Sequence, residues 1–154
     1  MKSIINGKIV LKDCVLENKV IVFDKHIREK LEIKDKDELI YKIKRLRIID
    51  NDPFALETVY IPEKMCKGLE EKLKENESLY RIFREEYKYK TEKAIQTIEP
   101  ISLSKDISDL LNKDINSLAL KFDRKVYIKE GKVLEYTISI FTSDKYQYQI
   151  MMTE

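Results

Sequence analysis

The stretch from Arg45 to Pro62, RLRIIDNDPFALETVYIP, constrains the fold more than any other part of the chain. Apolar residues alternate with polar ones on both sides of a central DNDP sequence, which is the pattern of a β-hairpin. Asp, Asn and Pro are residues that tight turns prefer. The sequence therefore predicts two antiparallel strands joined by a turn at 50–53.

Arg45 and Arg47 fall on the same face of the first of these strands, because successive side chains alternate between faces. The remaining residues of that face are apolar: Tyr41, Ile43 and Ile49. On the returning strand, Glu57 lies between Ala55 and Val59 on one side. The hairpin is thus expected to set one carboxylate opposite two guanidinium groups.

The two arginines are open to two interpretations from the residues alone. A guanidinium group offers a planar fork that binds phosphate or carboxylate through paired hydrogen bonds, and an apolar setting strengthens these bonds. Arg45 and Arg47 could therefore clamp an anionic ligand. Alternatively, they could form structural ion pairs with Glu57 and Glu135.

Length and composition indicate one ordinary domain and exclude several classes of protein. The 154 residues suffice for a single core. A formal charge of +2 gives no bulk electrostatic case for nucleic-acid binding. Cys14 and Cys66 are too far apart for a CxxC motif and are read as reduced thiols, and His26 has no ligand at metal-binding spacing and is read as a surface residue. We therefore expect no metal site.

Familiar enzyme and cofactor motifs are missing from the sequence. It has no GxGxxG, Walker loop, HExxH or serine elbow, and its three glycines exclude a glycine-rich phosphate cradle. An anion would have to be held by side chains and helix N-termini. No signal peptide or long apolar run is present, so we expect a cytoplasmic protein without membrane contact or cofactor.

The rest of the chain predicts further strands and short helices. Residues 8–23 favour a first strand or hairpin, and Asp24 is a candidate cap for a helix carrying Ile27 and Leu31. Later elements are a helix opened by capping groups at 76–78, a long strand at 91–103 whose Pro100 suits a sheet edge, a helix from Ser104, a hairpin at 118–141 turning at 129–131, and a final alternating strand through Tyr146, Tyr148, Ile150 and Met152.

Several of these segments resemble a known family, in the same order and with similar spacing. They are RLR with its acidic turn and LETVYIP, SLYRIFREEY at 78–87, AIQTIEP at 94–100, the short helix at 104–111, LALKFDRKVYIKEGKVLEYTISIF at 118–141, and DKYQYQI at 144–150. Together they resemble the UTRA domain, the effector-binding half of GntR-type bacterial transcription regulators of the HutC branch.

The resemblance implies an α+β fold like that of chorismate lyase, an antiparallel sheet with flanking helices. Residues 1–154 would form a single UTRA effector domain. Such regulators usually carry an N-terminal winged helix-turn-helix, and we expect that domain to be absent from this chain. DNA would then be contacted only through a separate domain.

The resemblance also implies a set of ligand-binding residues: Arg45, Arg47, Glu57, Ser78, Tyr80, Lys88, Arg124, Glu135 and Phe141. Ser78 could instead serve only as a helix cap, and Lys88 could be a solvated lysine. Arg124 could contact ligand or pair with Glu135. Phe141 stands where relatives commonly have Tyr, so one ligand hydrogen bond would be lost.

The implied function is that of a sensor rather than an enzyme. A small anionic metabolite, such as a sugar phosphate, would bind as effector and change how two protomers of a homodimer sit together. We expect the alternating segment from Val133 to Ile150 to supply a sheet edge for the dimer. The alternative hypothesis is an enzyme of the chorismate pyruvate-lyase type, in which arginines and a glutamate handle a dicarboxylate.

Overall fold

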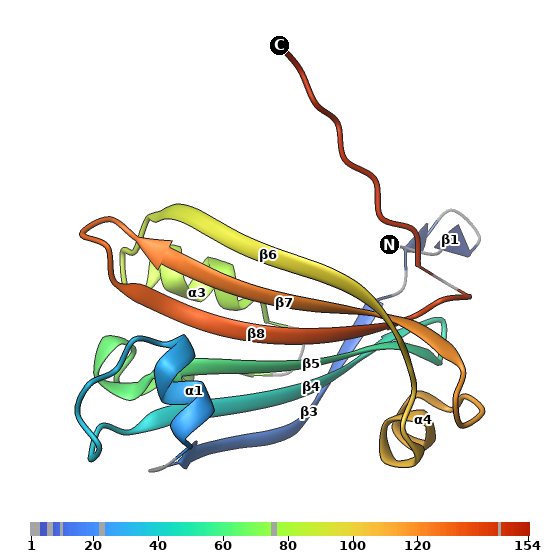
Figure 1. Cartoon of the computed structure of the whole chain (residues 1–154), viewed down its shortest axis with the longest axis horizontal. Coiled ribbons are helices and arrows are strands. Elements are labelled where there is room, and N and C mark those ends of the chain that lie inside the picture. Colours follow the sequence, from blue (N-terminus) through green and yellow to red (C-terminus); the bar gives the residue numbers. More distant parts are fainter. Residues whose placement is uncertain (1–3, 6–7, 10, 22–23, 75–76, 145) are drawn as a thin grey trace.

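A computed structural model describes residues 4–5, 8–9, 11–21, 24–74, 77–144 and 146–154. Its centre is a six-stranded antiparallel sheet in the order β3-β4-β5-β8-β7-β6 (Figure 1). The strands are β3 (Leu11–Ile21), β4 (Ile40–Ile49), β5 (Asp52–Pro62), β6 (Thr91–Ser102), β7 (Leu118–Ile128) and β8 (Val133–Thr142). A small ribbon of β1 (Ile4–Ile5) and β2 (Lys8–Ile9) precedes them.

Short helices cover both faces of this sheet (Figure 1). They are α1 (Lys25–Lys30), the 3-10 turn η1 (Glu63–Met65), α2 (Leu69–Lys72), α3 (Leu79–Glu85) and α4 (Lys105–Leu111). Helices α2 and α3 share one buried cluster with Ile43 and Val59, whereas α1 and α4 pack near Ile40 and Leu56 on the opposite face. The expected sheet with flanking helices is confirmed.

The central hairpin is confirmed, with a tighter turn than predicted. Strand β5 begins at Asp52, so only Asp50 and Asn51 connect the strands. Both have positive φ, 51° and 65°, as in the type I′ turn that matches the twist of a two-residue hairpin. Arg45 lies directly across from Glu57, as expected, but only because a β-bulge lies between the pairs Ile48–Pro53 and Arg47–Ala55.

Other local predictions are also confirmed. The Asp24 side chain accepts a hydrogen bond from the Ile27 backbone N–H at 3.1 Å and caps α1, and Ser78 accepts one from Arg81 at 3.3 Å and caps α3. Asn76 lies outside the described residues. Strand β6, with Pro100 near its end, is an edge strand, and residues 11–21 form one strand rather than a hairpin.

Two predictions about the last third of the chain are wrong. Residues 146–154 form no strand; Tyr146 and Tyr148 pack with their rings against Phe122, and the segment then leaves the sheet (Figure 1). The expected edge within 133–150 is also absent, because β8 is hydrogen-bonded to β5 on one side and β7 on the other. The edges of the sheet are β3 and β6.

Helix α3 is held on the sheet by its apolar face, and this packing positions the residues at its start. Leu79, Ile82 and Phe83 are buried against the cluster on β4 and β5. The same packing directs Tyr80 toward β8, where its hydroxyl meets Glu135. Among the described residues, no helix has the length and apolar composition needed to cross a bilayer.

The turn geometry yields a test of the hairpin. Asn51→Ala should lower the free energy of unfolding by about 1 kcal/mol, because alanine lacks the short polar side chain that helps Asn tolerate a left-handed backbone. Asn51→Gly should be as stable as the wild type or more stable, since glycine has no Cβ. Urea unfolding of both variants measures the difference. Equal destabilisation by the two substitutions would contradict the turn assignment.

Candidate functional site

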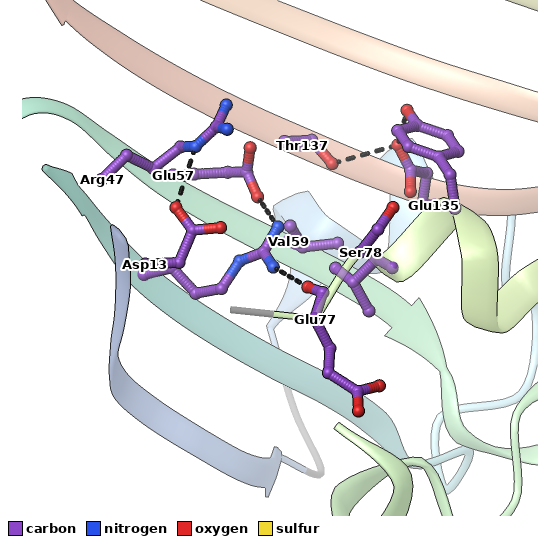
Figure 2. A pocket seen from close by; sticks show the side chains of 11 residues that line it. Asp13, Arg47, Glu57, Val59, Glu77, Ser78, Glu135 and Thr137 are labelled. Carbon is purple, nitrogen blue, oxygen red and sulfur yellow. Dashed lines mark hydrogen bonds and ion pairs between the residues drawn. The ribbon is translucent and has the colours of Figure 1, made fainter. Parts of the chain in front are cut away.

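A cavity of about 280 Å³ opens on the sheet face beside the start of α3 (Figure 2). Strands β3, β4, β5 and β8 and the residues entering α3 contribute its walls. The lining residues are Asp13, Arg45, Arg47, Glu57, Val59, Glu77, Ser78, Leu79, Tyr80, Glu135 and Thr137. Alternation along β4, together with the bulge in β5, therefore places both arginines and the glutamate at one cavity.

Arg45 is committed to the protein through both ends of its guanidinium fork. Its Nη2 contacts Glu57 Oε1 at 2.5 Å, and its Nη1 donates to the Glu77 carbonyl at 3.0 Å (Figure 2). The Arg45 side chain is only 9% exposed and that of Glu57 16%. This pair joins β4 to β5 and ties the chain just before α3 to the sheet, so Arg45 forms the ion pair with Glu57 that one of the two interpretations expected.

Arg47 is paired differently from what the sequence suggested. Its Nε donates to Asp13 Oδ1 at 3.0 Å, so the ion pair runs to β3 and not to Glu135. Figure 2 shows its terminal nitrogens directed away from Asp13. Within the described part of the chain, neither of these nitrogens has a hydrogen-bond partner. Arg47 thus keeps two donors available at the cavity.

Asp13 is a site residue that the sequence analysis missed. It lies across from Arg47 in the register between β3 and β4. Its pairing depends on which strands are neighbours, and residues 8–23 could only be assigned to a strand or hairpin. Alternation within β3 becomes informative only once β3 is known to lie beside β4.

Glu135 is a buried carboxyl group held by two hydroxyls. Tyr80 donates to its Oε1 at 2.9 Å, and Thr137 donates to the same atom at 3.3 Å. Burial raises the pKa of Glu135, the negative charge of Glu57 adds to this rise, and the Tyr80 hydrogen bond and the charge of Arg124 oppose it. Burial also raises the pKa of Tyr80, which keeps the phenol protonated as a donor.

A second cavity of about 370 Å³ adjoins the first along the same sheet face. Its lining residues are Arg47, Glu57, Tyr80, Gln96, Phe122, Arg124, Thr137, Ser139, Phe141, Tyr146 and Tyr148. Arg124 lies over the ring of Tyr80, 5.4 Å from its centroid. Neither the hydrogen bonds nor the ion pairs of the described residues join Arg124 directly to Glu135, although its charge acts on that carboxyl group.

The structure brings together every predicted site residue except Lys88. Lys88 follows α3 with an exposed side chain and lines neither cavity. Gln96, Tyr146 and Tyr148 are additional lining residues that the sequence analysis did not propose. The alternating YQY pattern was the available signal for the two tyrosines, but it was assigned to a strand.

Metal and thiol chemistry find no support near these cavities. Within the described residues, no group of three His, Cys, Asp or Glu side chains is arranged to hold a metal ion. His26 is exposed on α1. Cys14 and Cys66 are free thiols, and burial raises the pKa of Cys66 to about 12, which disfavours the reactive thiolate.

The chain is thus an α+β domain in which an antiparallel sheet and the start of α3 border a charged cavity. Residues 10–147 match the UTRA domain model. The chain therefore belongs to the UTRA domain family.

Two curated relatives are transcription regulators. The chain is 28% identical over 137 residues to the mannosyl-D-glycerate transport/metabolism system repressor MngR of Escherichia coli K12, covering 89% of this chain and 56% of the relative. It is 25% identical over 109 residues to the HTH-type transcriptional repressor NagR of Bacillus subtilis, covering 71% and 44%. The chain thus spans about half the length of the curated relatives that it matches.

Solved structures of regulators share the fold. The effector domain of PhnF from Mycobacterium smegmatis superposes with a TM-score of 0.87 at 19% identity, covering 94% of this chain and 88% of that chain. A GntR-family regulator from Bacillus cereus superposes with a TM-score of 0.83 at 22% identity, covering 93% and 99%. This likeness confirms the expected α+β fold.

The buried carboxyl group predicts a pH-dependent stability. The native Glu135 pKa is raised, so the folded protein keeps this proton to higher pH than the unfolded chain. Its contribution to stability is therefore present below the ordinary carboxyl pKa and is lost as pH rises through the native pKa. The free energy lost is about 1.4 kcal/mol for each pKa unit by which the native value exceeds the ordinary one. Glu135→Gln keeps an acceptor for Tyr80 without this loss.

The melting temperature of Glu135→Gln relative to the wild type should therefore increase as pH rises above the ordinary carboxyl range, and should level off beyond the native pKa. Thermal melts from about pH 4 to about pH 8 measure this difference. Ser139→Ala, which removes a hydroxyl from the same strand without removing a hydrogen bond to Glu135, is the control. A constant difference across the range would contradict a raised Glu135 pKa.

Proposed function

We propose that residues 1–154 form the effector-binding domain of a GntR-type transcription regulator of the HutC subfamily, and that this domain binds a small anionic metabolite, a sugar phosphate in the form we favour. The intact cytoplasmic regulator would contact DNA through a separate N-terminal winged helix-turn-helix domain. Membership of the UTRA family and the regulatory names of the relatives support this role. No catalytic step or cofactor belongs to it.

One observation supports an anionic ligand. Arg47 is fixed by Asp13 through Nε, and its terminal nitrogens are left without partners in the described structure at a cavity of about 280 Å³. A phosphate oxygen pair fits such a fork, and the hydrogen bonds would be charge-assisted. The Ser78 hydroxyl lines the same cavity and offers a further contact.

The remaining cavity groups suit a polyhydroxylated ligand. Glu57 and Glu135 present carboxylate or carboxyl oxygens, and Thr137 presents a hydroxyl. Such groups exchange hydrogen bonds with sugar hydroxyls and fix their orientation. One relative is named for mannosyl-D-glycerate, which also combines a sugar with an acidic group. A sugar carrying a phosphate therefore matches both the Arg47 donors and the oxygen-bearing side chains of the cavity.

Signalling requires that the effector favour one arrangement of the regulator over another. We extend the proposal to a homodimer that associates through β6. This strand is an edge of the sheet, and Ile95 on it is 53% exposed. An exposed edge strand with apolar side chains is a ready template for pairing with another chain.

The alternative is an enzyme of the chorismate pyruvate-lyase type. Arginines beside a glutamate could also hold a dicarboxylate, but a shared fold does not fix an activity. The matched relatives are regulators, which favours the sensor. Incubating the purified domain with chorismate and assaying pyruvate tests this directly, and catalytic release of pyruvate would overturn the sensor proposal.

The anion clamp predicts different outcomes for the two arginines. Arg47→Ala should weaken binding of a hexose 6-phosphate by about 2 kcal/mol, roughly thirtyfold, because two charge-assisted donors are removed. It should lower the melting temperature less than Arg45→Ala does, because the Arg47 side chain is 29% exposed and holds Asp13 through Nε alone. Arg45→Ala should instead lower stability by about 3 kcal/mol, since it leaves Glu57 buried without its partner. Calorimetric titration and thermal melting of both variants measure the two effects.

The ligand for this test comes from a thermal-shift panel of sugar phosphates, free sugars, amino acids and organic acids, because a ligand bound only to the native state raises its stability. Lys44→Ala is the matched control: it removes a positive charge from the same strand, at a position alternate to the two arginines. Folded Arg47→Ala protein with wild-type phosphate affinity would rule out the clamp.

The dimer proposal predicts a molar mass in solution of twice that of the chain. Light scattering at concentrations well above micromolar should show it, and Ile95→Lys should shift the protein toward the monomer by placing a charge at the β6 edge. Thr97→Lys, two residues along the same strand, introduces the same charge without removing an apolar side chain and should weaken the dimer less. A strictly monomeric wild type would contradict the association.

A further inference from the structure

The two cavities on the sheet face are compartments of one site. Four residues line both of them: Arg47, Glu57, Tyr80 and Thr137. The inner compartment, of about 280 Å³, is bounded by Arg45, Asp13 and Ser78. The outer compartment, of about 370 Å³, continues from it toward β7 and the C-terminal segment. A ligand held at Arg47 therefore has room to extend outward along the sheet.

Aromatic rings form the wall of the outer compartment. Tyr146 is stacked on Phe141, with centroids 4.0 Å apart and an angle of 24° between planes. The Phe122 ring meets Tyr146 and Tyr148 edge-on, at 5.6 Å and 5.3 Å. Although residues 146–148 belong to no strand, these contacts hold the segment against the sheet. The C-terminal segment thus contributes a fixed wall to the cavity.

Polar groups accompany these rings. The Nε of Arg124 is buried and has no hydrogen-bond partner among the described residues, which is a cost unless a further acceptor satisfies it. Gln96 approaches the Tyr148 hydroxyl at 3.5 Å from β6, and Ser139 lines the same compartment. Aromatic faces combined with a few convergent polar groups are typical of a site for a ring that bears hydroxyls.

From this arrangement we infer that the outer compartment binds a second sugar ring of the effector, packed against Tyr148 and Tyr146 and hydrogen-bonded by Arg124. This inference rests on the proposed function, because the acidic group of the same ligand occupies the inner compartment at Arg47. The effector is accordingly a phosphorylated disaccharide or glycoside rather than a phosphorylated monosaccharide. Tyr148 and Arg124 are specificity-determining residues.

Two matched probes test the second ring. Maltose 6′-phosphate carries the phosphorylated glucose ring of glucose 6-phosphate with one further glucose attached through its anomeric carbon. Calorimetric titration of the whole chain should show maltose 6′-phosphate binding about tenfold more tightly than glucose 6-phosphate, as expected for one added aromatic contact. Tyr148→Ala should abolish this difference.

Tyr148 suits this test because its side chain is 42% exposed and its loss should not unfold the protein, which a thermal melt checks. Gln147→Ala, at a neighbouring exposed residue that lines neither compartment, should keep the wild-type preference. Equal affinities for the two sugars, or a preference that survives Tyr148→Ala, would overturn the second-ring site and leave the sensor proposal standing. Failure of both phosphates to bind would overturn the sugar phosphate effector as well.

Discussion

The ion pair between Arg45 and Glu57 is the interaction on which the rest of the site depends. It joins two strands at positions directly opposite each other, and the second terminal nitrogen of Arg45 holds the Glu77 carbonyl just before α3. A buried charge is tolerated when it is paired and hydrogen-bonded, and it costs several kcal/mol when it is not. One guanidinium group therefore fixes the sheet and the start of the helix relative to each other. The shape of the cavity between the sheet and the start of α3 therefore depends on this ion pair.

Much of this arrangement was predictable because it is local. Alternation along β4 placed Arg45 and Arg47 on one face. The two-residue turn alone would pair Arg45 with Leu56, and a β-bulge at Phe54, which the sequence did not reveal, shifts the register so that Glu57 lies opposite Arg45. The helix caps at Asp24 and Ser78 were also predictable from the sequence, because a cap depends only on the next three residues. The resemblance to the UTRA family added the order of the elements, and with it the residues on the second hairpin.

The parts that could not be predicted depend on which segments become neighbours. Asp13 pairs with Arg47 only because β3 lies beside β4, and a strand's sequence does not reveal its partner. The segment at 146–148 alternates as a strand would, but both hydrogen-bonding sides of β7 are already paired, with β6 and with β8. Tyr146 and Tyr148 instead pack their rings against Phe122. Periodicity indicates which side chains share a face of a strand, whereas tertiary packing determines which other segments that face contacts.

Charge balance inside the cavity bears on how such a domain could respond to an anion. Arg45 and Arg47 each hold a carboxylate already, and Glu135 is buried with a raised pKa beside Tyr80. These groups therefore leave no isolated buried charge that would destabilise the fold. An anion must gain more from the free donors of Arg47 than it loses by desolvation near Asp13 and Glu57. Because these carboxylates would repel an anion that is not placed at the fork, they would make the proposed binding selective at some cost in affinity.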